Sequence, residues 1–405
     1  MRFVPRARLD SCVHCGLCLA SCPTYLELGT EADSPRGRIQ LIRGLEDGRL
    51  QPTAEVTRHL DLCLGCRACE TACPSGVPYG TLIEAARPYV EAGRPWPRRI
   101  LRRALSRVLT TPALRRTVFA PARMVAGAGW VRRLATRLPA VAYAAALPKP
   151  ARTALPPVLE PDGSPRGTAV LLTGCVADSL FGATNAATAA LLVRAGVRVI
   201  VPPGQTCCGA LAAHLGLDDV ARVLGRRIAG AVGSIQADWI VSNAAGCGAH
   251  LRQLAHLLPD VPDASRVAAR VVDALALLAE LGLPAAARSL ERTVAVHDPC
   301  HLAHGQGVRG EVRRLLERVP GVRLVELEES DHCCGSAGTY NLTEPAMAAR
   351  LLARKLGHVE RSGAQVLAAA NPGCLLQLRA GAIARGLAVD VEHPIDLLAA
   401  AHLPC

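Results

Sequence analysis

The sequence of 405 residues predicts an α+β protein of several domains. A helical N-terminal domain is expected first, and two duplicated α/β domains with parallel sheets are expected after it. Three observations predict this fold class. Two cysteine runs of identical spacing lie near the N-terminus. In the second half, short apolar runs alternate with helical patterns, as in a parallel sheet. The order of strands and cysteines there occurs twice at matched spacing, which indicates a duplicated domain.

Length and composition fit a folded protein of this organisation. We predict a helical domain at 1–91, a basic helical connector at 92–165, and α/β domains at 166–288 and 289–405. Apolar residues make up 50% of the chain, which argues against disorder. The first ten residues lack the apolar centre of a secretory signal, and no apolar run is long enough for a membrane span. The sequence therefore predicts a cytoplasmic protein, in which clustered cysteines are typical of metal or redox sites.

The two cysteine runs have the same spacing, C-x2-C-x2-C-x3-C-P. They consist of Cys12, Cys15, Cys18 and Cys22, and of Cys63, Cys66, Cys69 and Cys73. This spacing binds a 4Fe-4S cube in bacterial two-cluster ferredoxins, where the fourth cysteine ligates the other cluster. We therefore predict a ferredoxin-type domain with two clusters. One would be held by Cys12, Cys15, Cys18 and Cys73, and the other by Cys63, Cys66, Cys69 and Cys22. Zinc is the alternative, although zinc sites usually pair two C-x2-C units.

Between the runs, Ser34 and Pro35 predict the start of a helix, with Ser34 as N-cap and Pro35 in the first turn. Its buried side is predicted to carry Ile39, Leu41, Ile42 and Leu45.

The positive charge of the protein is concentrated in the connector. Between Ala92 and Leu159 there is no acidic residue, but there are thirteen arginines and one lysine. Apolar residues recur there on one helical face, at Ile100, Leu101, Ala104, Leu105, Val108 and Leu109. Prolines are predicted to cut the segment into short helices, at Pro112, Pro121, Pro139 and Pro148. Two interpretations of this segment remain. It is either a solvated connector or a docking surface over 94–152 for a partner or an anionic membrane. We expect no nucleic acid, since no binding motif accompanies the charge.

In the second half, each predicted strand ends just before a cysteine. In the first copy, the strands at 168–173, 197–201 and 239–241 lead to Cys175, to Cys207 and Cys208, and to Cys247. In the second copy, the strands at 293–296, 322–327 and 366–370 lead to Cys300, to Cys333 and Cys334, and to Cys374. Because the carboxyl ends of parallel strands meet at one edge, the four cysteines of each copy should converge there. They would form a metal or cluster site or a redox pair, unless they are merely small buried side chains.

The second copy carries titratable residues that the first copy lacks. His297 precedes Cys300, and His301 and His304 follow it. Histidine can carry protons or ligate a metal at neutral pH, although His301 and His304 could simply cap the next helix. The candidate catalytic residues are therefore His297, Cys300, His301, Cys333, Cys334 and Cys374.

The whole layout resembles the iron–sulfur subunit of bacterial glycolate oxidase, a glycolate dehydrogenase, over nearly the entire chain. The resemblance lies in five segments: the first cysteine run with its continuation to Gly44, VPPGQTCCGAL, HDPCHLAHGQG, HCCGSAGTYNLTEP and NPGCLLQLRAG. Related layouts occur in an anaerobic glycerol-3-phosphate dehydrogenase subunit, in heterodisulfide reductases and in lactate-utilisation proteins. In this group the two α/β units are called CCG domains, and we use that name below.

The resemblance implies an electron-transfer subunit with two 4Fe-4S clusters. Partner flavoprotein subunits with FAD would oxidise glycolate or D-lactate, and a quinone or another acceptor, but not oxygen or NAD, would receive the electrons. A peripheral location on the inner face of the cell membrane is compatible with this role. The alternatives are a subunit of a D-lactate, glycerol-3-phosphate or heterodisulfide reductase-like complex, and a membrane-docking module with catalysis at the second CCG site.

The CCG sites depart from the heterodisulfide reductase pattern at one position. That pattern ends in C-x-x-C, whereas Ala244 and Asn371 occupy the first of these positions here. Each site thus offers four thiols, and an additional cluster, zinc or no metal are the alternatives.

Overall fold

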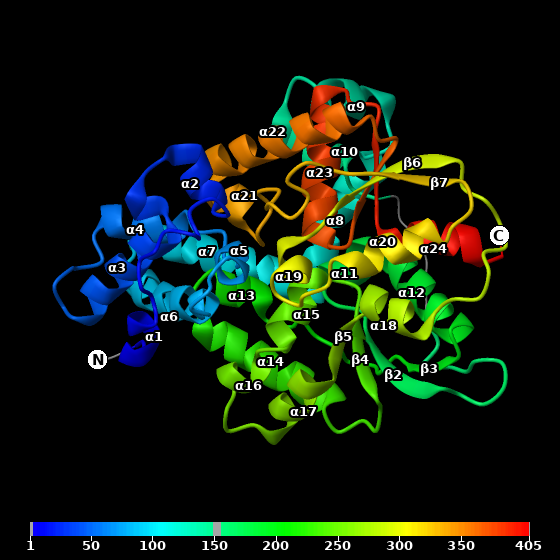
Figure 1. Ribbon diagram of the computed structural model, residues 1–405, viewed down its shortest axis with the longest axis horizontal. Helices are drawn as coiled ribbons and strands as arrows, with labels where there is room; N and C mark the ends of the chain where they lie inside the picture. Colours follow the sequence, from blue (N-terminus) through cyan, green and yellow to red (C-terminus); the bar gives the residue numbers. More distant parts are fainter. Residues whose placement is uncertain (1–2, 149–154, 405) are drawn as a thin grey trace.

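The computed structural model describes residues 3–148 and 155–404, and it is a mixed protein with helices and parallel sheets (Figure 1). Residues 149–154 of the predicted basic surface lie outside the described residues. The N-terminal part, at the left of Figure 1, is helical. Its elements are α1 (Arg6–Asp10), α2 (Pro23–Leu28), the short 3-10 helix η1 (Glu31–Asp33), α3 (Pro35–Glu46), α4 (Ala54–Asp61), α5 (Ala68–Thr71) and α6 (Tyr79–Ala92).

The predicted helix between the two cysteine runs is confirmed as α3. The Ser34 hydroxyl oxygen accepts a 3.0 Å hydrogen bond from the backbone N–H of Gly37, and Pro35 occupies the first turn. This cap satisfies one of the backbone donors that a helix N-terminus leaves unpaired. Ile39, Ile42 and Leu45 are buried as expected, whereas Leu41 is only half-buried.

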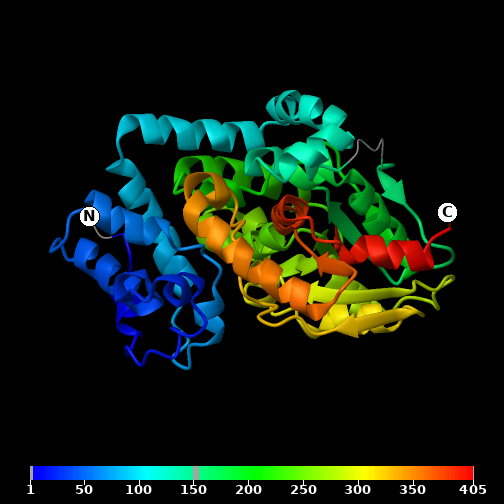
Figure 2. The same cartoon turned by 90° about the horizontal axis from the view of Figure 1, so that it is seen from above.

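The basic connector forms four helices: α7 (Trp96–Thr110), α8 (Pro112–Val125), α9 (Gly129–Ala135) and α10 (Pro139–Ala145). Figure 2 shows them along one side of the molecule, between the N-terminal helices and the CCG domains. Pro112 and Pro139 begin helices as predicted, but the expected break at Pro121 is wrong, because Pro121 lies inside α8. Arg123 anchors the helix just beyond this proline through a 2.9 Å hydrogen bond to the carbonyl oxygen of Ser179. This tertiary contact thus offsets the loss of the backbone hydrogen bond that a proline removes from a helix.

The first CCG domain contains a five-stranded sheet in the order β1-β3-β2-β4-β5, parallel except for β1. Its strands are β1 (Val158–Leu159), β2 (Gly167–Leu172), β3 (Val197–Ile200), β4 (Trp239–Ser242) and β5 (Val271–Asp273). Its helices are α11 (Val176–Leu180), α12 (Gly182–Arg194), α13 (Ala210–His214), α14 (Asp218–Val232), α15 (Ala245–Leu251), α16 (Leu254–Leu257), α17 (Pro262–Arg270) and α18 (Ala274–Leu281).

The second CCG domain repeats this order with a four-stranded parallel sheet, β7-β6-β8-β9. Its strands are β6 (Arg292–His297), β7 (Val322–Val325), β8 (Val366–Ala369) and β9 (Asp390–Glu392). Its helices are α19 (Cys300–Ala303), α20 (Gly310–Glu317), α21 (Tyr340–Thr343), α22 (Pro345–Ser362), α23 (Pro372–Arg385) and α24 (Pro394–His402). The six predicted strands are confirmed, whereas β1, β5 and β9, with two or three residues each, escaped the sequence analysis.

The two CCG domains pack against each other as pseudo-symmetric halves. Helix α12 packs on α24, and α20 packs on α18. In each pair one helix follows the first parallel strand of its domain, β2 or β6, and the other follows the last strand, β9 or β5. One continuous apolar core contains residues of both sheets, for example Leu171 and Val241 with Val296 and Ala368. The halves therefore bring their equivalent edges together. Among the described residues, no helix is both long and apolar enough to cross a membrane.

Candidate metal and redox site

The fourth cysteine of the first run lies close to the second run. Burial raises the pKa of the Cys69 thiol, and the neighbouring thiols of Cys66, Cys63 and Cys22 raise it further. Cys22, Cys63 and Cys69 are all buried. The fold thus brings Cys22 to the three cysteines with which the crossed arrangement groups it.

Arg38 is a buried cation beside these thiols, and no pattern in the sequence predicted it. Its side chain on α3 is 1% exposed and pairs with the equally buried Asp33 at 3.6 Å. Its Nη1 lies 3.9 Å from Cys22 Sγ, and its Nε donates a 2.7 Å hydrogen bond to the His59 carbonyl oxygen. Burial alone would lower the pKa of Arg38, but Cys63, together with Tyr79, Cys22 and Asp33, holds it above its usual value. A permanent positive charge therefore stands next to these sulfurs.

Cys63 receives hydrogen bonds suited to a thiolate ligand. The backbone N–H of Gly65 lies 3.4 Å from Cys63 Sγ, and the Tyr79 hydroxyl lies 3.5 Å from the same atom. Arg87 also holds this loop, because its Nη2 donates a 2.7 Å hydrogen bond to the Cys63 carbonyl oxygen. Donors of this kind stabilise negative charge on sulfur and tune a bound cluster.

The first three cysteines of the first run and the last cysteine of the second run lie near the surface. Cys15 is exposed, and Cys12, Cys18 and Cys73 are half-buried. Burial raises the pKa of the Cys18 thiol, and the thiols of Cys12 and Cys22 contribute to the rise. Cys12, Cys18 and Cys73 pack against the same apolar core of the N-terminal domain. The thiols thus divide into an outer group, Cys12, Cys15, Cys18 and Cys73, and an inner group, Cys22, Cys63, Cys66 and Cys69.

In the first CCG domain, the four predicted cysteines converge as two close pairs. Cys175 and Cys207 have their sulfurs 3.4 Å apart, and Cys208 and Cys247 have theirs 3.3 Å apart. The glycine that follows the double cysteine has a positive φ in both domains, +97° at Gly209 and +86° at Gly335. A Cβ at Gly335 would lie 2.7 Å from the Ala348 carbonyl oxygen, so the turn accepts only glycine.

In the second CCG domain, the four cysteines interact in a row. The Cys333 thiol interacts with those of Cys300 and Cys334, and Cys334 also interacts with Cys374. The Asn371 amide donates a 3.5 Å hydrogen bond to Cys374 Sγ. All four thiols are buried, and contact with Cys333 together with burial raises the pKa of Cys300.

One cavity of about 210 Å³ joins the two CCG sites. Its wall contains all eight cysteines of the two domains, namely Cys175, Cys207, Cys208, Cys247, Cys300, Cys333, Cys334 and Cys374. The connector helices contribute Leu109, Phe119 and Tyr143 to the same wall. The sequence predicted that the four cysteines of each domain converge. The packing of the domains also brings the two sets of cysteines together.

Two of the predicted histidines of the second domain, His301 and His304, lie in or near this site. Neither is the N-cap of the next long helix, because Arg309 is the N-cap of α20. His301 lines the cavity, with its Nδ1 3.4 Å from Cys300 Sγ. His304 contacts the N-terminal domain, because its Nδ1 lies 2.9 Å from the Thr71 hydroxyl oxygen. His297 is not part of the cavity wall and lies buried at the end of β6.

His214 is a cavity residue that the sequence analysis missed. Its ring lies edge-to-face with that of His301 at a centroid distance of 5.2 Å, and its Nδ1 lies 3.3 Å from Arg87 Nη1. Burial lowers the pKa of both imidazoles, that of His301 to about 4, so both are neutral at pH 7. A lone histidine at the end of an apolar helix gives no sequence signal, and only the packing of the two domains pairs it with His301.

The inner N-terminal thiols lie against the second CCG site. Burial raises the pKa of the Cys66 thiol, and the thiol of Cys300 raises it further. Cys66 packs against a buried cluster that includes Cys300, Cys333 and Leu62. Sulfur atoms of the two domains are thus near neighbours across the interface.

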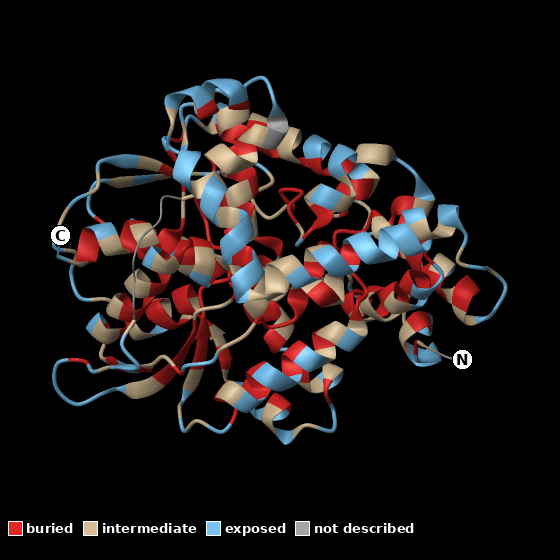
Figure 3. Cartoon of the chain, turned by 180° about the vertical axis from the view of Figure 1, so that it is seen from behind, coloured by how far each residue is buried: buried red, intermediate tan, exposed pale blue. Residues whose placement is uncertain are grey.

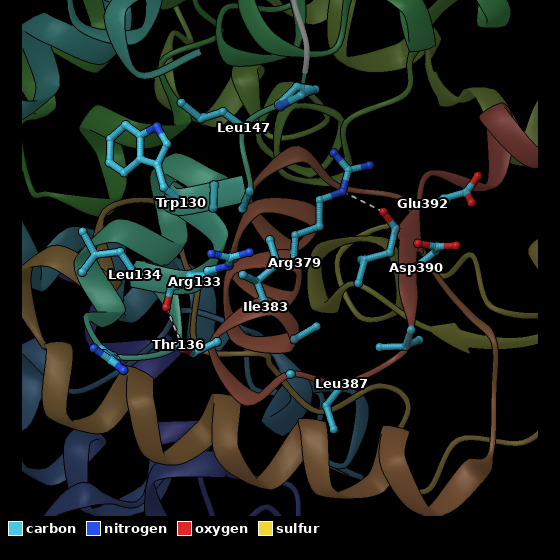
Figure 4. A pocket seen from close by; sticks show the side chains of 18 residues that line it. Trp130, Arg133, Leu134, Thr136, Leu147, Arg379, Ile383, Leu387, Asp390 and Glu392 are labelled. Carbon is cyan, nitrogen blue, oxygen red and sulfur yellow. Dashed lines mark hydrogen bonds between the residues drawn. The ribbon is translucent and has the colours of Figure 1, made fainter. Parts of the chain in front are cut away.

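A separate hollow of about 1080 Å³ lies between the connector and the second CCG domain (Figure 4). Trp130 and Leu134 of α9 face Arg379 and Ile383 of α23 across it, and Glu392 stands at its edge. None of the predicted site residues lines it, so it is distinct from the thiol-lined cavity.

Comparison with known proteins supports this reading of the chain. The 4Fe-4S dicluster domain family matches residues 8–77, and the cysteine-rich domain family matches residues 169–252 and 294–379. A probable glycolate oxidase iron-sulfur subunit of Bacillus subtilis is 38% identical over 96% of this chain and 93% of that protein. The glycolate oxidase iron-sulfur subunit of Escherichia coli is 36% identical over the same shares. Lactate utilization protein A of Geobacillus kaustophilus is 32% identical over 56% of this chain and 97% of its own length. With a two-cluster N-terminal domain, a duplicated CCG unit and relatives matched along almost its whole length, this chain belongs to the family of glycolate oxidase iron–sulfur subunits.

Proposed function

We propose that this chain is the electron-transfer subunit of a flavin-dependent glycolate dehydrogenase complex. Partner flavoprotein subunits with FAD would oxidise glycolate to glyoxylate, and a quinone-type acceptor would receive the electrons. One observation carries this proposal: the inner N-terminal thiols lie beside Cys300 and Cys333 of the second CCG site. A row of redox-capable groups from the surface to a deep cavity suits a subunit that conducts electrons rather than one that binds the hydroxy acid. D-lactate is the alternative substrate of such a complex.

The N-terminal cysteines would hold two 4Fe-4S clusters in the crossed arrangement. The outer cluster would take Cys12, Cys15, Cys18 and Cys73, and the inner cluster would take Cys63, Cys66, Cys69 and Cys22. The proximity of Cys22 to the second run supports the crossing. The residues present also fit the charge of such a group, because Arg38 supplies a buried cation, and Gly65 and Tyr79 supply hydrogen bonds to Cys63. Bound clusters would supply one-electron redox chemistry at these positions.

The residues around the two groups have different tasks. The exposed Cys15 and its half-buried neighbours leave the outer group accessible to a partner subunit. Around the inner group, Leu62, Leu64 and Tyr340 exclude water and fix the distance to the second CCG domain. An additional cluster or zinc in the CCG domains would use Cys175, Cys207, Cys208 and Cys247, or Cys300, Cys333, Cys334 and Cys374.

The basic connector is the surface that would meet an anionic membrane, where a quinone acceptor resides. Apolar side chains of α7 and α8 point outward, with Trp96, Ile100 and Leu101 more than half exposed. Arg98, Arg99, Arg103 and Arg107 are exposed on the same helix, and Figure 3 shows these helices with exposed stretches on the rear face. Amphipathic basic helices with tryptophan bind the surface of anionic bilayers.

Anaerobic purification with and without the neighbouring flavoproteins tests the proposal. We expect about eight irons per chain and a paramagnetic signal on reduction, as two cubes require. Glycolate should reduce these centres when FAD subunits co-purify, and it should not reduce the chain alone. Reduction by D-lactate but not by glycolate would reassign the substrate. Absence of reducible iron in properly assembled material would contradict the electron-transfer role.

A further inference from the structure

One sheet edge of the first CCG domain is covered by a strand, and the equivalent edge of the second domain is open. In the first domain, β1 runs antiparallel to β3, with Leu159 opposite Val199. In the second domain, β7 is the last strand of its sheet, and its main contacts are with β6 and α20. The two pseudo-symmetric halves therefore differ at this edge.

Strands β3 and β7 are equivalent in sequence and in geometry. The segments GVRVIV at 196–201 and GVRLVE at 321–326 align residue by residue. The glycine before each strand has a positive φ, +87° at Gly196 and +82° at Gly321. In both domains, the carbonyl oxygen of this glycine accepts a backbone hydrogen bond from the start of the neighbouring strand, at Arg166 or Arg292.

The backbone groups of Leu324 face the open side of β7. Successive residues of a strand turn their N–H and C=O groups to opposite sides. Because the Gly321 carbonyl faces β6, Leu324, three residues on, faces away from β6. In the first domain the same alternation turns Val201 towards β1, where its N–H donates a 2.8 Å hydrogen bond to the Pro157 carbonyl oxygen. The edge of β7 thus offers main-chain groups where the first domain already has a strand bound.

The open edge also leaves apolar side chains incompletely buried. Val197 and Val199 of β3 are 0% exposed, and Leu159 of β1 packs on the same core. Val322 and Leu324 of β7 pack against that core too, but they are only half-buried. An apolar side chain placed opposite Leu324 would complete its burial, as Leu159 does beside Val199.

Arg323 indicates the charge of a segment that fits this edge. Its counterpart Arg198 forms an ion pair of 3.0 Å with Glu160, which directly follows β1. Arg323 is exposed and donates a 3.0 Å hydrogen bond to the Thr293 hydroxyl, but no carboxylate of the described residues pairs with it. The edge therefore suits a segment in which a carboxylate follows an apolar residue.

The residues before β6 do not supply this segment. They follow another path, because the backbone N–H groups of Ala287 and Arg288 both donate to the Ala401 carbonyl oxygen. Pairing with β7 of a second copy is disfavoured by charge. Centred on Leu324, it would place the two Arg323 side chains on one face in diagonal positions, about 7–8 Å apart.

We propose that the open edge of β7 binds an extended segment of a partner flavoprotein subunit, which joins the sheet as an antiparallel strand. The segment places an apolar side chain opposite Leu324 and a carboxylate beside Arg323. Strand addition of this kind takes its affinity from main-chain hydrogen bonds and its specificity from alternate side chains. The inference rests on the proposed function for the identity of the partner, but not for the chemistry of the edge.

A peptide with the sequence of 155–161, LPPVLEP, is the probe for the full-length chain purified without oxygen. It should slow hydrogen exchange over 322–326 and leave 197–201 unchanged, because β1 already covers that strand. The same peptide with glutamine in place of its glutamate should bind about two- to fivefold more weakly, as the loss of an exposed ion pair predicts. Arg323→Gln should remove this difference between the peptides, and the matched control Arg198→Gln should preserve it.

The native complex with its flavoprotein subunits tests the identity of the partner. We expect slower exchange over 322–326 in the complex than in the isolated chain. Leu324→Pro should lower retention of the flavoprotein about tenfold, because proline removes an outward N–H without breaking a bond to β6. Its iron content should stay that of the parent. Arg323→Glu, which keeps every backbone group, should lower retention as well.

Unchanged exchange over 322–326 in the presence of the peptide overturns strand addition at this edge. Equal exchange in the complex and in the isolated chain, while glycolate still reduces the centres, overturns the flavoprotein as the occupant. Protection that appears only at high concentration of the chain alone overturns it too and assigns the edge to a second copy. Absence of any flavoprotein partner contradicts the proposed function, and the peptide experiment then decides the edge by itself.

Discussion

The hydroxyl of Tyr340 donates a buried 2.9 Å hydrogen bond to the carbonyl oxygen of Leu62. Leu62 directly precedes Cys63, and Tyr340 lies six residues after Cys334. One hydrogen bond thus joins the loop of the inner N-terminal thiols to the double-cysteine loop of the second CCG domain. At the equivalent position of the first domain, His214 approaches the same loop through Arg87. Both CCG domains therefore contact the loop that carries the inner thiols.

Tyr340→Phe should destabilise this interface. The substitution removes the hydroxyl and leaves the buried Leu62 carbonyl without its partner, which costs about 1–3 kcal/mol. We expect a lower apparent unfolding temperature with unchanged iron content. Tyr89→Phe is the control, because Tyr89 is partly exposed and its ring stacks on Phe3, a contact that phenylalanine retains. An unchanged unfolding temperature in Tyr340→Phe would show that the hydrogen bond does not hold the interface.

Double substitution distinguishes crossed from run-wise ligation of the clusters. If Cys22 belongs with the second run, Cys22→Ser combined with Cys63→Ser damages only the inner cluster, and about four irons should remain. If each run held its own cluster, the same pair would damage both. Cys18→Ser with Cys63→Ser is the matched control and should lose both clusters in either arrangement. Iron analysis and electron paramagnetic resonance give the count.

Arg38→Met should lower the reduction potential of the inner cluster. The buried guanidinium stabilises the more negative, reduced form, so its removal favours oxidation. A shift on the order of 50 mV, close to tenfold in the one-electron equilibrium, is expected. The single substitution leaves Asp33 with a partner, because His59 Nδ1 lies 2.8 Å from its Oδ1. Arg36→Met is the control for the inner cluster, because Arg36 contacts the first run at the His14 carbonyl oxygen instead. A redox titration that gives the inner cluster equal potentials in all three chains would refute the role of Arg38.

Asp273 should make the protein less stable as the pH rises from about 4 to 7. Burial raises the pKa of this N-cap carboxyl of α18 to about 7, while its unfolded value is about 3.9. In this window unfolding releases a proton, so rising pH favours the unfolded chain, by about 4 kcal/mol over the whole window. Asp273→Asn keeps the 2.9 Å cap to the Leu275 N–H and removes the charge.

Thermal unfolding at pH 5 and pH 8 measures this effect. The unfolding temperature of Asp273→Asn should exceed that of the parent at the higher pH and match it more closely at the lower one. Asp260→Asn is the control, because the Asp260 side chain is 74% exposed, and it should leave the unfolding temperature unchanged at both pH values. An equal gain at both pH values would contradict a titrating carboxyl at this site.

Replacing Arg98, Arg99, Arg103 and Arg107 by glutamine should weaken binding to anionic vesicles. Each arginine near such a surface contributes about 1 kcal/mol, so together they account for roughly 100- to 1000-fold in affinity. Flotation with phosphatidylserine vesicles measures the loss. Replacement of Arg226, Arg227 and Arg266, which are exposed on the first CCG domain, is the control. Equal flotation of both variants would show that the connector is not the membrane-binding surface.

Local patterns predicted most elements correctly. The six longer strands, the α3 cap at Ser34 and the position of each cysteine after a strand follow from apolar periodicity and turn residues. The three short strands were missed because two or three residues carry no period.

The connector shows where local patterns fail. Its predicted apolar face leaves Ile100 and Leu101 exposed, whereas Arg102 and Ser106 on the opposite side of α7 are buried. Arg102 ion-pairs with Glu91 at 2.9 Å and donates to the Leu215 carbonyl oxygen at 3.0 Å. These partners lie on other elements, so the orientation of α7 depends on contacts that its own sequence does not contain.

The sequence by itself determined the kind of chemistry: cysteine spacing specifies soft metal ligands, and matched repeats specify two similar domains. The tertiary structure decided which thiols meet. The packing of the two sheets opens their cysteines into one cavity, the fold of the second sheet brings His297 within 4.8 Å of Cys334 and Cys374, and the packing of the N-terminal domain places Cys66 beside Cys300. Spacing along the chain is a local property, whereas these encounters depend on apolar burial between segments that are distant in the sequence.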